Sequence, residues 1–143
     1  MTEPENIFIV KPIASSQGKG IYLTNKIQEI ATGTNTIVQR YIHNPMLING
    51  YKFDLRFYVL LTNVNPLRIY IFEEGLVRFA TEQYFIGQPF NDKNRFVHLT
   101  NYSVNKESKK FVQNKDPLED NVGSKWSLSA LKKYFLNNVL LIN

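Results

Sequence analysis

Apolar and polar residues alternate most regularly between positions 51 and 61. Bulky apolar side chains occupy the odd positions of this segment, whereas Lys52, Asp54 and Arg56 occupy even positions. A period of two residues is that of a β-strand, whose side chains point alternately to opposite faces. The segment therefore predicts one strand with a firmly packed apolar face and a charged face.

Shorter apolar runs, each bounded by turn residues, predict further strands. These runs cover residues 7–11, 21–23, 36–42, 67–72, 76–81 and 96–103. Pro12 ends the first run, because proline cannot donate to a strand ladder. Glu73, Glu74 and Gly75 lie between the fourth run and the fifth, and they predict a hairpin that joins these two strands.

Helical signals occur at two places. Thr24 or Asn25 can cap a short helix that ends at Gly33, and Ser127 can cap a second helix. The side chains expected to point inward are Ile27, Ile30 and Ala31 in the first helix, and Leu128, Leu131, Tyr134 and Phe135 in the second. Several strands with few helices indicate the α+β class.

The remaining segments predict loops. Residues 85–95 are rich in turn formers, and residues 104–124 are polar and charged, which predicts a mobile loop. The sequence ends on the apolar stretch Leu140-Leu141-Ile142-Asn143. An apolar end predicts a cut within a structural element, so we expect the chain to be a fragment.

Length and composition limit the class of protein. A chain of 143 residues suits one domain, and the absence of cysteine excludes a disulfide framework. The first six residues lack the apolar core of a signal peptide. The longest apolar run, residues 57–61, is too short to span a membrane. These features predict a soluble, intracellular protein.

The net charge of +5 comes from 17 basic and 12 acidic residues. Such a field attracts nucleotides, nucleic acid or an acidic protein tail, and a mildly basic soluble surface has the same charge. The basic residues are scattered along the chain and form no stripe, which disfavours a nucleic-acid binder.

Lys11 and the loop after it form the first candidate site. Glycines let backbone N–H groups approach a phosphate, and a lysine at a strand end supplies positive charge. The loop Gly18-Lys19-Gly20 is neither a P-loop nor a dinucleotide fingerprint, because it lacks the other residues of those motifs. A surface turn with a solvated lysine has the same composition, so both interpretations stay open.

Charged residues on predicted strands form the second candidate site. Lys52, Asp54 and Arg56 point to one side, where two cations can bind phosphates and the carboxylate can orient a cation or a ribose hydroxyl. Arg78 can grip a carboxylate through two N–H groups. A half-exposed strand and an arginine lying over apolar neighbours would give the same pattern.

Other chemistries find little support. His43 and His98 lie far apart without metal-ligand spacing, so we interpret both as structural. Protein-kinase motifs, Gly-x-Ser-x-Gly and a cysteine nucleophile are all absent from the sequence. No pair of carboxylates offers an evident magnesium site.

Five ordered segments together resemble the tubulin–tyrosine-ligase-like family, specifically its glutamylase branch. They are Ile9-Val10-Lys11-Pro12, Gln17-Gly18-Lys19-Gly20-Ile21, Val38-Gln39-Arg40-Tyr41-Ile42, Lys52-Phe53-Asp54-Leu55-Arg56 and His98-Leu99-Thr100-Asn101-Tyr102-Ser103. Residues 75–81 and 123–127 also look like that branch, and the likeness runs from about Ile7 to Leu136. Lys19 stands where relatives often carry arginine.

The resemblance implies a partial ATP-grasp fold and assigns roles to individual residues. The residues implied for ATP binding are Lys11, Gln17, Gly18, Gln39, Arg40, Tyr41, Ile42, Lys52, Phe53, Asp54, Thr100 and Asn101. Those implied for glutamate binding are Arg78, Tyr102, Ser103 and Lys125, and Gln17 is also implied for the acceptor chain. Lys11, Lys52 and Arg56 would be catalytic, offsetting charge on the transferred phosphoryl group.

The implied activity is an ATP-dependent protein–glutamate ligase, a tubulin polyglutamylase that works through an acyl phosphate. ATP and Mg2+ would be its cofactors, with the metal ligands expected beyond Asn143. Its partners would be free glutamate and the acidic C-terminal tails of tubulin, without nucleic acid or membrane. We expect residues 1–143 to form a single catalytic domain that is truncated at both ends and lacks the N-terminal lobe and the metal-binding strands.

Two further expectations accompany this interpretation. The protein would act in the cytoplasm on the cytoskeleton, with the cilium or basal body as a specific location. The alternative function is a non-catalytic remnant of the family that binds nucleotide or microtubules without turnover, because the metal ligands are missing from this sequence.

Overall fold

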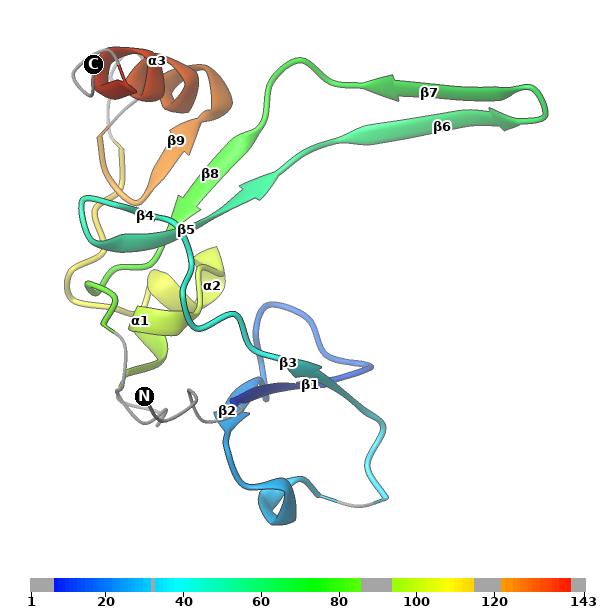
Figure 1. Ribbon diagram of the computed structural model, residues 1–143, viewed down its shortest axis with the longest axis vertical. Helices are drawn as coiled ribbons and strands as arrows, with labels where there is room; N and C mark the ends of the chain where they lie inside the picture. Colours follow the sequence, from blue (N-terminus) through cyan, green and yellow to red (C-terminus); the bar gives the residue numbers. More distant parts are fainter. Residues whose placement is uncertain (1–6, 32, 86–93, 115–121, 140–143) are drawn as a thin grey trace.

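The computed structural model describes residues 7–31, 33–85, 94–114 and 122–139, and confirms a mixture of strands and helices (Figure 1). The strands are β1 (Phe8–Pro12), β2 (Tyr22–Thr24), β3 (Thr36–Arg40), β4 (Leu47–Ile48), β5 (Tyr51–Arg56), β6 (Val59–Val64), β7 (Leu67–Ile71), β8 (Leu76–Phe79) and β9 (Lys125–Ser127). The helices are η1 (Ile27–Glu29, a 3-10 helix), α1 (Arg95–His98), α2 (Tyr102–Asn105) and α3 (Leu128–Val139). Among the described helices, none is long and apolar enough to cross a membrane.

Two small antiparallel sheets carry the fold, with α1 and α2 between them (Figure 1). The first has the strand order β2-β1-β3, and the second has the order β4-β5-β8-β9. In the first sheet Val10 pairs with Tyr22 on one side and with Val38 on the other, and its side chain is fully buried. In the second sheet Arg78 lies between Asp54 and Lys125, so three charged residues form one row across three strands.

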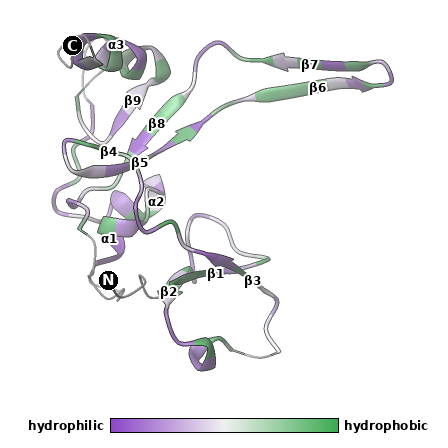
Figure 2. Cartoon of the chain, viewed as in Figure 1, coloured by the Kyte–Doolittle hydropathy of each residue, from purple (hydrophilic) through white to green (hydrophobic). Residues whose placement is uncertain are grey.

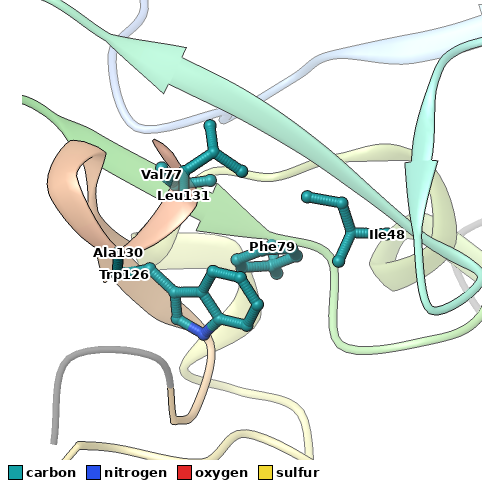
Figure 3. Packing of buried hydrophobic residues seen from close by; sticks show 6 residues of the cluster. All are labelled: Ile48, Val77, Phe79, Trp126, Ala130 and Leu131. Atoms are coloured by element: carbon teal, nitrogen blue, oxygen red, sulfur yellow. The ribbon is translucent and has the colours of Figure 1, made fainter. Parts of the chain in front are cut away.

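The main apolar core lies between the second sheet and α3 (Figure 3). Its buried members are Ile48 of β4, Val77 and Phe79 of β8, Trp126 of β9, and Ala130 and Leu131 of α3. Each large apolar side chain buried in this way stabilises the fold by about 1.5–3 kcal/mol. This core fixes the strands that carry the charged row.

The structure confirms the C-terminal helix and its cap. The Ser127 Oγ accepts a hydrogen bond from the backbone N–H of Ala130 at 2.9 Å, as an N-cap side chain does. Leu131 is buried, and Leu128, Tyr134 and Phe135 pack partly buried against the same core. The sequence therefore predicted both the start and the inner face of α3.

The predicted long strand over residues 51–61 is wrong in its second half. β5 ends at Arg56, and β6 and β7 form a separate hairpin that projects from the second sheet (Figures 1 and 2). Phe57, Val59 and Leu61 are 47%, 61% and 54% exposed, and Leu55 is also exposed, so the apolar face is packed only near Tyr51 and Phe53. Alternation reports strand conformation, but it does not say which other element covers the apolar face.

The predicted hairpin at Glu73, Glu74 and Gly75 is also wrong. β7 pairs with β6 across the turn at Asn65-Pro66, whereas β8 pairs with β5 and β9. The residues between β7 and β8 carry the chain from the projecting hairpin back to the second sheet. Asn and Pro are turn formers, so the sequence does contain a signal for this turn. The predicted hairpin at Glu73, Glu74 and Gly75 overlooked it.

Two local predictions need correction for a shared reason. Residues 27–29 form one 3-10 turn, and Ile27 is exposed, so the predicted helix to Gly33 does not form. The predicted strand 96–103 is instead the two short helices α1 and α2. Elements of three or four residues are too short to show a period in the sequence. Residues 86–93 and 115–121 of the predicted loops lie outside the described residues.

Candidate functional site

Lys52 is a cation that two other segments of the chain hold in place. It lies on β5, and its ammonium donates hydrogen bonds to the Tyr41 hydroxyl and to the His98 backbone carbonyl, both at 2.9 Å. The ammonium also lies over the Tyr41 ring, 4.6 Å from its centre. Segments from β5, the end of β3 and α1 therefore converge on one amino group.

Lys11 and Lys52 are held by neighbouring side chains of one segment. Lys11 donates to the Gln39 side-chain oxygen at 2.9 Å, across the β1–β3 pair, and Lys52 donates to the hydroxyl of Tyr41, two residues further along. Burial lowers the pKa of Lys52 to about 8, the Asp54 carboxylate opposes this shift, and the Lys11 charge adds to it. Side chains two residues apart on an extended segment point to the same side, so two cations from different sheets face one side of residues 39–41.

Arg56 does not share this position. It lies four residues along β5 from Lys52, about 13 Å away at the rise of a strand, opposite Leu76 and exposed. The three predicted catalytic cations are therefore divided: Lys11 and Lys52 lie close enough to interact, whereas Arg56 lies toward the projecting hairpin.

The loop between β1 and β2 docks on α2. Gln17 and Gly18 have φ values of 63° and 79°, in the left-handed region that suits glycine. The Ser103 hydroxyl donates to the Gln17 carbonyl at 2.7 Å. A Cβ on Gly18 would lie 2.9 Å from the Val104 side chain and 3.2 Å from that of Asn101, so the glycine is needed for this close approach.

This loop and the two short helices enclose a pocket of about 680 Å3. Its charged lining residues are Lys19, Arg95, Lys106 and Glu107, and it also includes Gln17, Gly18 and Ser103. The Arg95 guanidinium pairs with Glu107 at 2.6 Å. Lys19 and Lys106 give the pocket a net positive charge that suits an acidic ligand.

A second, small pocket lies at the charged row of the second sheet. It is lined by Arg78, Thr100, Tyr102 and Lys125 among others. Three of the four residues predicted to bind glutamate therefore meet in one place. The fourth, Ser103, lines the larger pocket and bonds to Gln17 instead.

Asp54 is engaged from two sides. Arg78 donates to one carboxylate oxygen at 2.9 Å from Nε, and the Thr100 hydroxyl donates to the other oxygen. The predicted nucleotide contacts Asp54 and Thr100 thus belong to the network that holds Arg78. Asn101, by contrast, lies against Gly18 of the docked loop.

The other residues predicted to bind nucleotide do not all face these two centres. Gln39, Arg40 and Ile42 are exposed on and just after β3. Phe53 packs against the apolar core beside Phe79, with ring centres 5.9 Å apart, so its side chain faces away from the charged face of β5.

Asn105 is a positioning residue that the sequence reasoning missed. Its side chain accepts from the Thr81 backbone at 2.9 Å and donates to the carbonyls of Leu99 at 2.7 Å and Asn101 at 3.1 Å. It is 1% exposed. A buried amide with partners on both sides fixes the segment that carries Thr100. Nothing in the sequence signals this role other than an asparagine two residues after the segment His98–Ser103.

The acidic side chains of the described ranges are dispersed. No group of three histidine, aspartate or glutamate side chains gathers within these ranges. The carboxylate of Asp54 is already bonded to Arg78 and Thr100. The position of the metal ligands beyond Asn143 stays a prediction.

Comparisons with known proteins identify the family of the chain. Residues 1–140 match the tubulin-tyrosine ligase family. The chain is 53% identical over 127 residues to tubulin polyglutamylase TTLL5 of Homo sapiens, which covers 89% of this chain and 10% of that protein. It is 45% identical over 130 residues to tubulin polyglutamylase ttll-5 of Caenorhabditis elegans, covering 91% of this chain and 18% of that protein.

A ciliate relative extends the range of organisms. The probable beta-tubulin polyglutamylase of Tetrahymena thermophila is 48% identical over 127 residues, covering 89% of this chain and 11% of that protein. The chain thus spans between about a tenth and a fifth of the length of these relatives.

Proposed function

The chain belongs to the tubulin-tyrosine ligase family, and on this premise we propose that it forms part of an ATP-dependent ligase that adds glutamate to tubulin. The relatives are named as tubulin polyglutamylases. The observation that carries the proposal is that Gln39 and Tyr41, two residues apart, hold the ammonium groups of Lys11 and Lys52, which come from two different sheets. Two ammonium groups there would bind the phosphates of ATP.

The fold supports a partial ATP-grasp arrangement over residues 1–143. One sheet supplies Lys11 and the glycine loop, the other supplies Lys52, and the α1–α2 segment lies between them. ATP would bind between the sheets, with its adenine along residues 39–42. The loop at Gln17 and Gly18, already docked on α2, would close over the phosphates.

The proposed reaction forms an amide in two steps. The γ-phosphoryl group of ATP passes to a carboxylate, giving an acyl phosphate and ADP. The amine of the second reactant, after losing a proton, then attacks the acyl carbon, and the bond to the phosphate oxygen breaks. Lys11 and Lys52 would offset charge on the transferred group, whereas Arg56 would act only if the ligand extends along β5. Mg2+, when bound, would add positive charge at the phosphates.

The charged row beside the small pocket suits the incoming glutamate, which would lie over the row because the pocket itself has a volume of only about 10 Å3. Arg78 and Lys125 carry two positive charges, and Asp54 carries one negative charge, so the row has a net charge of +1. Glutamate at neutral pH has two carboxylates and one ammonium, a net charge of −1. Tyr102 would border this ligand, and the Arg78–Lys125 pair would provide a cation for each carboxylate.

The larger pocket suits the acceptor. Its lining includes Gln17 and the cations Lys19, Arg95 and Lys106, which would attract an acidic peptide such as a tubulin tail. Such an acceptor would place the protein on microtubules in the cytoplasm. A cilium or basal body is a narrower location that only imaging of the protein can test.

A non-catalytic member of the family is the second candidate. Such a protein would bind ATP or tubulin without turnover.

One labelling experiment separates these proposals. The complete protein product is incubated with ATP, labelled glutamate and microtubules, and label on tubulin is measured with and without ATP. We expect ATP-dependent label, lost in Lys52→Ala and kept in Lys132→Ala, which removes an exposed lysine from α3. A separate titration measures ATP binding. If ATP binds but no label appears on tubulin, the result supports the non-catalytic candidate. If label appears on another protein, that protein and not tubulin is the acceptor.

A further inference from the structure

We propose that Tyr41 and His98 are positioning residues that hold the Lys52 ammonium in place for the phosphates. The inference rests on the proposed function, because it assigns the ligand of Lys52 to ATP. It concerns the two side chains, which contact Lys52 or each other and would not contact the ligand themselves.

Lys52 uses two of its three N–H donors on protein oxygens. One goes to the Tyr41 hydroxyl and one to the His98 backbone carbonyl, both at 2.9 Å. An ammonium carries three donors in a fixed tetrahedral arrangement. With two of them fixed, the direction of the third is fixed too, and a lysine stem that would otherwise sample many rotamers presents one donor to a ligand.

A hydrogen bond joins the Tyr41 hydroxyl and the His98 Nδ1 at 3.1 Å, and the tautomer of the ring decides which of them donates. In the arrangement that we propose, the Tyr41 oxygen accepts from Lys52 and its hydroxyl donates to an unprotonated Nδ1. Burial, with a further contribution from the Lys52 charge, lowers the pKa of His98 to about 4, so the ring is neutral at physiological pH, as this arrangement requires.

The tyrosine keeps its proton under the same conditions. Burial raises the pKa of the Tyr41 hydroxyl far above its usual value. In this arrangement the Tyr41 hydroxyl donates a hydrogen bond to His98, and its oxygen lone pair accepts a hydrogen bond from Lys52. A neutral histidine and a neutral tyrosine stabilise the ammonium without cancelling its charge, which a carboxylate in their place would do.

Packing holds the pair in position. Tyr41 and His98 are 6% and 5% exposed, and their rings meet edge to face with centres 5.7 Å apart. The Tyr84 ring lies edge-on to His98 at 5.6 Å, and its hydroxyl donates to the His43 carbonyl at 2.7 Å. Neither side chain can turn away from Lys52 without disturbing this aromatic cluster.

The ionisable groups that face Lys52 are Tyr41, His98, Asp54 and Lys11, and Tyr84 faces the first two. Of these, Lys52 itself is the one whose charge changes just above neutral pH, since its pKa is about 8. ATP affinity should therefore fall as pH rises above about 8. Loss of the Tyr41 acceptor would destabilise the ammonium further and move this fall to lower pH.

The test measures ATP binding to the complete protein by calorimetry between pH 6.5 and 9.5, a range chosen to bracket the Lys52 transition. We expect Tyr41→Phe to weaken ATP binding at pH 7 by about tenfold, the effect of one hydrogen bond to a charged group. We also expect its affinity to begin falling at a lower pH than in the unmodified protein. Tyr134→Phe, which removes a remote hydroxyl bonded to Asn49 at 3.3 Å, is the control and should change neither value.

A second pair of variants covers the possibility that Tyr41→Phe fails to fold. Asn and Leu are similar in size, but only Asn can accept a hydrogen bond at the place of the histidine Nδ1. We expect His98→Asn to retain most of the ATP affinity and its pH midpoint, and His98→Leu to lose both. Equal effects of the two substitutions, or an unshifted midpoint in Tyr41→Phe, would overturn the inference.

The controls also separate this inference from the proposed function. If the unmodified protein binds no ATP, the proposed function is wrong and the inference falls with it. If the unmodified protein binds ATP and the variants match it at every pH, the ligase proposal stands and the positioning role is wrong.

Discussion

Asp54 and Arg78 lie directly opposite each other on β5 and β8, where the guanidinium donates from Nε to one carboxylate oxygen at 2.9 Å and its Nη2 lies 2.8 Å from the same oxygen in an ion pair. The other oxygen of Asp54 accepts from Thr100. Asp54 therefore orients Arg78 and has little capacity left for a ligand. A guanidinium has five N–H donors, so Arg78 retains donors for a substrate carboxylate in the small pocket.

Arg78→Ala should reduce glutamate transfer while leaving ATP binding intact. The substitution removes a charge-assisted contact to a substrate carboxylate, worth about 1.5–3 kcal/mol, or about tenfold to a hundredfold in kcat/KM for glutamate. Steady-state kinetics of the complete protein with varied glutamate, together with an ATP titration, measure both effects.

Arg68→Ala is the matched control, since Arg68 lies exposed on β7 of the projecting hairpin. It should leave the kinetics for glutamate unchanged. If Arg78→Ala weakens ATP and glutamate binding to the same degree, Arg78 acts in general folding of the site and has no specific role toward glutamate.

Gly18→Ala and Gly33→Ala test the docked loop. Both glycines have positive φ values, 79° and 85°, so both substitutions cost about 1 kcal/mol of backbone strain. A Cβ at Gly33 meets nothing within 4 Å, whereas one at Gly18 lies 2.9 Å from Val104. Gly18→Ala should therefore cost about 1–2 kcal/mol more and weaken ATP binding.

Urea unfolding and ATP titration of the two variants make this comparison. The difference between them reports the contact of the loop with α2, because the backbone strain is common to both. Equal stability and equal ATP affinity would mean that the loop docks elsewhere.

The sequence predicted local conformation better than pairing. The conformation of β1, β2, β3 and α3 followed from apolar runs and from turn and cap residues, all of which are local signals. Strand partners are not local: Leu76–Phe79 has the alternation of a hairpin strand, yet it pairs with β5 and β9 because Val77 and Phe79 bury against Trp126 and Leu131. Burial against distant segments decided the topology, and period-two alternation carries no information about it.

The candidate site shows the same contrast between features that the sequence predicts and features that depend on long-range packing. Family likeness predicted Arg78, Tyr102 and Lys125 as one group, and the structure gathers them in one pocket; their binding of glutamate stays a prediction. The support of Lys52 by Tyr41 and His98 was not predicted, because the three residues are far apart in the chain and a lone histidine reads as structural. Buried networks of this kind appear only when side-chain distances are known.

Leu131→Ala should lower the stability of the domain substantially. Leu131 is 3% exposed in the core under α3, so truncation leaves a cavity and costs about 2–5 kcal/mol. Leu136→Ala on the same helix is the matched control, because Leu136 is 66% exposed and its loss should cost less than about 0.5 kcal/mol. Thermal unfolding of both variants tests whether α3 packs as described, and similar losses would contradict it.

Acid should destabilise the fold through His98. Its pKa is about 4 in the folded protein and near 6.5 in the unfolded chain, so between these values the unfolded state binds more protons. Stability is therefore fully present above pH 6.5 and falls as the pH drops through this window toward 4. The loss from this one group is at most about 3 kcal/mol, since one pKa unit corresponds to about 1.4 kcal/mol.

The variant His98→Asn isolates this contribution. Carboxylates such as Glu74, whose pKa is lowered by hydrogen bonds from Ser129 and the Gly75 backbone, also lose stabilising contacts in acid, but they do so equally in both proteins. The difference in melting temperature between the two proteins should therefore narrow as the pH is lowered from 7 to 4.5, because only the histidine protein must give up a buried neutral ring. A constant difference across this range would show that His98 titrates normally, which would mean that the ring is hydrated and that its Nδ1 does not fix the Tyr41 hydroxyl.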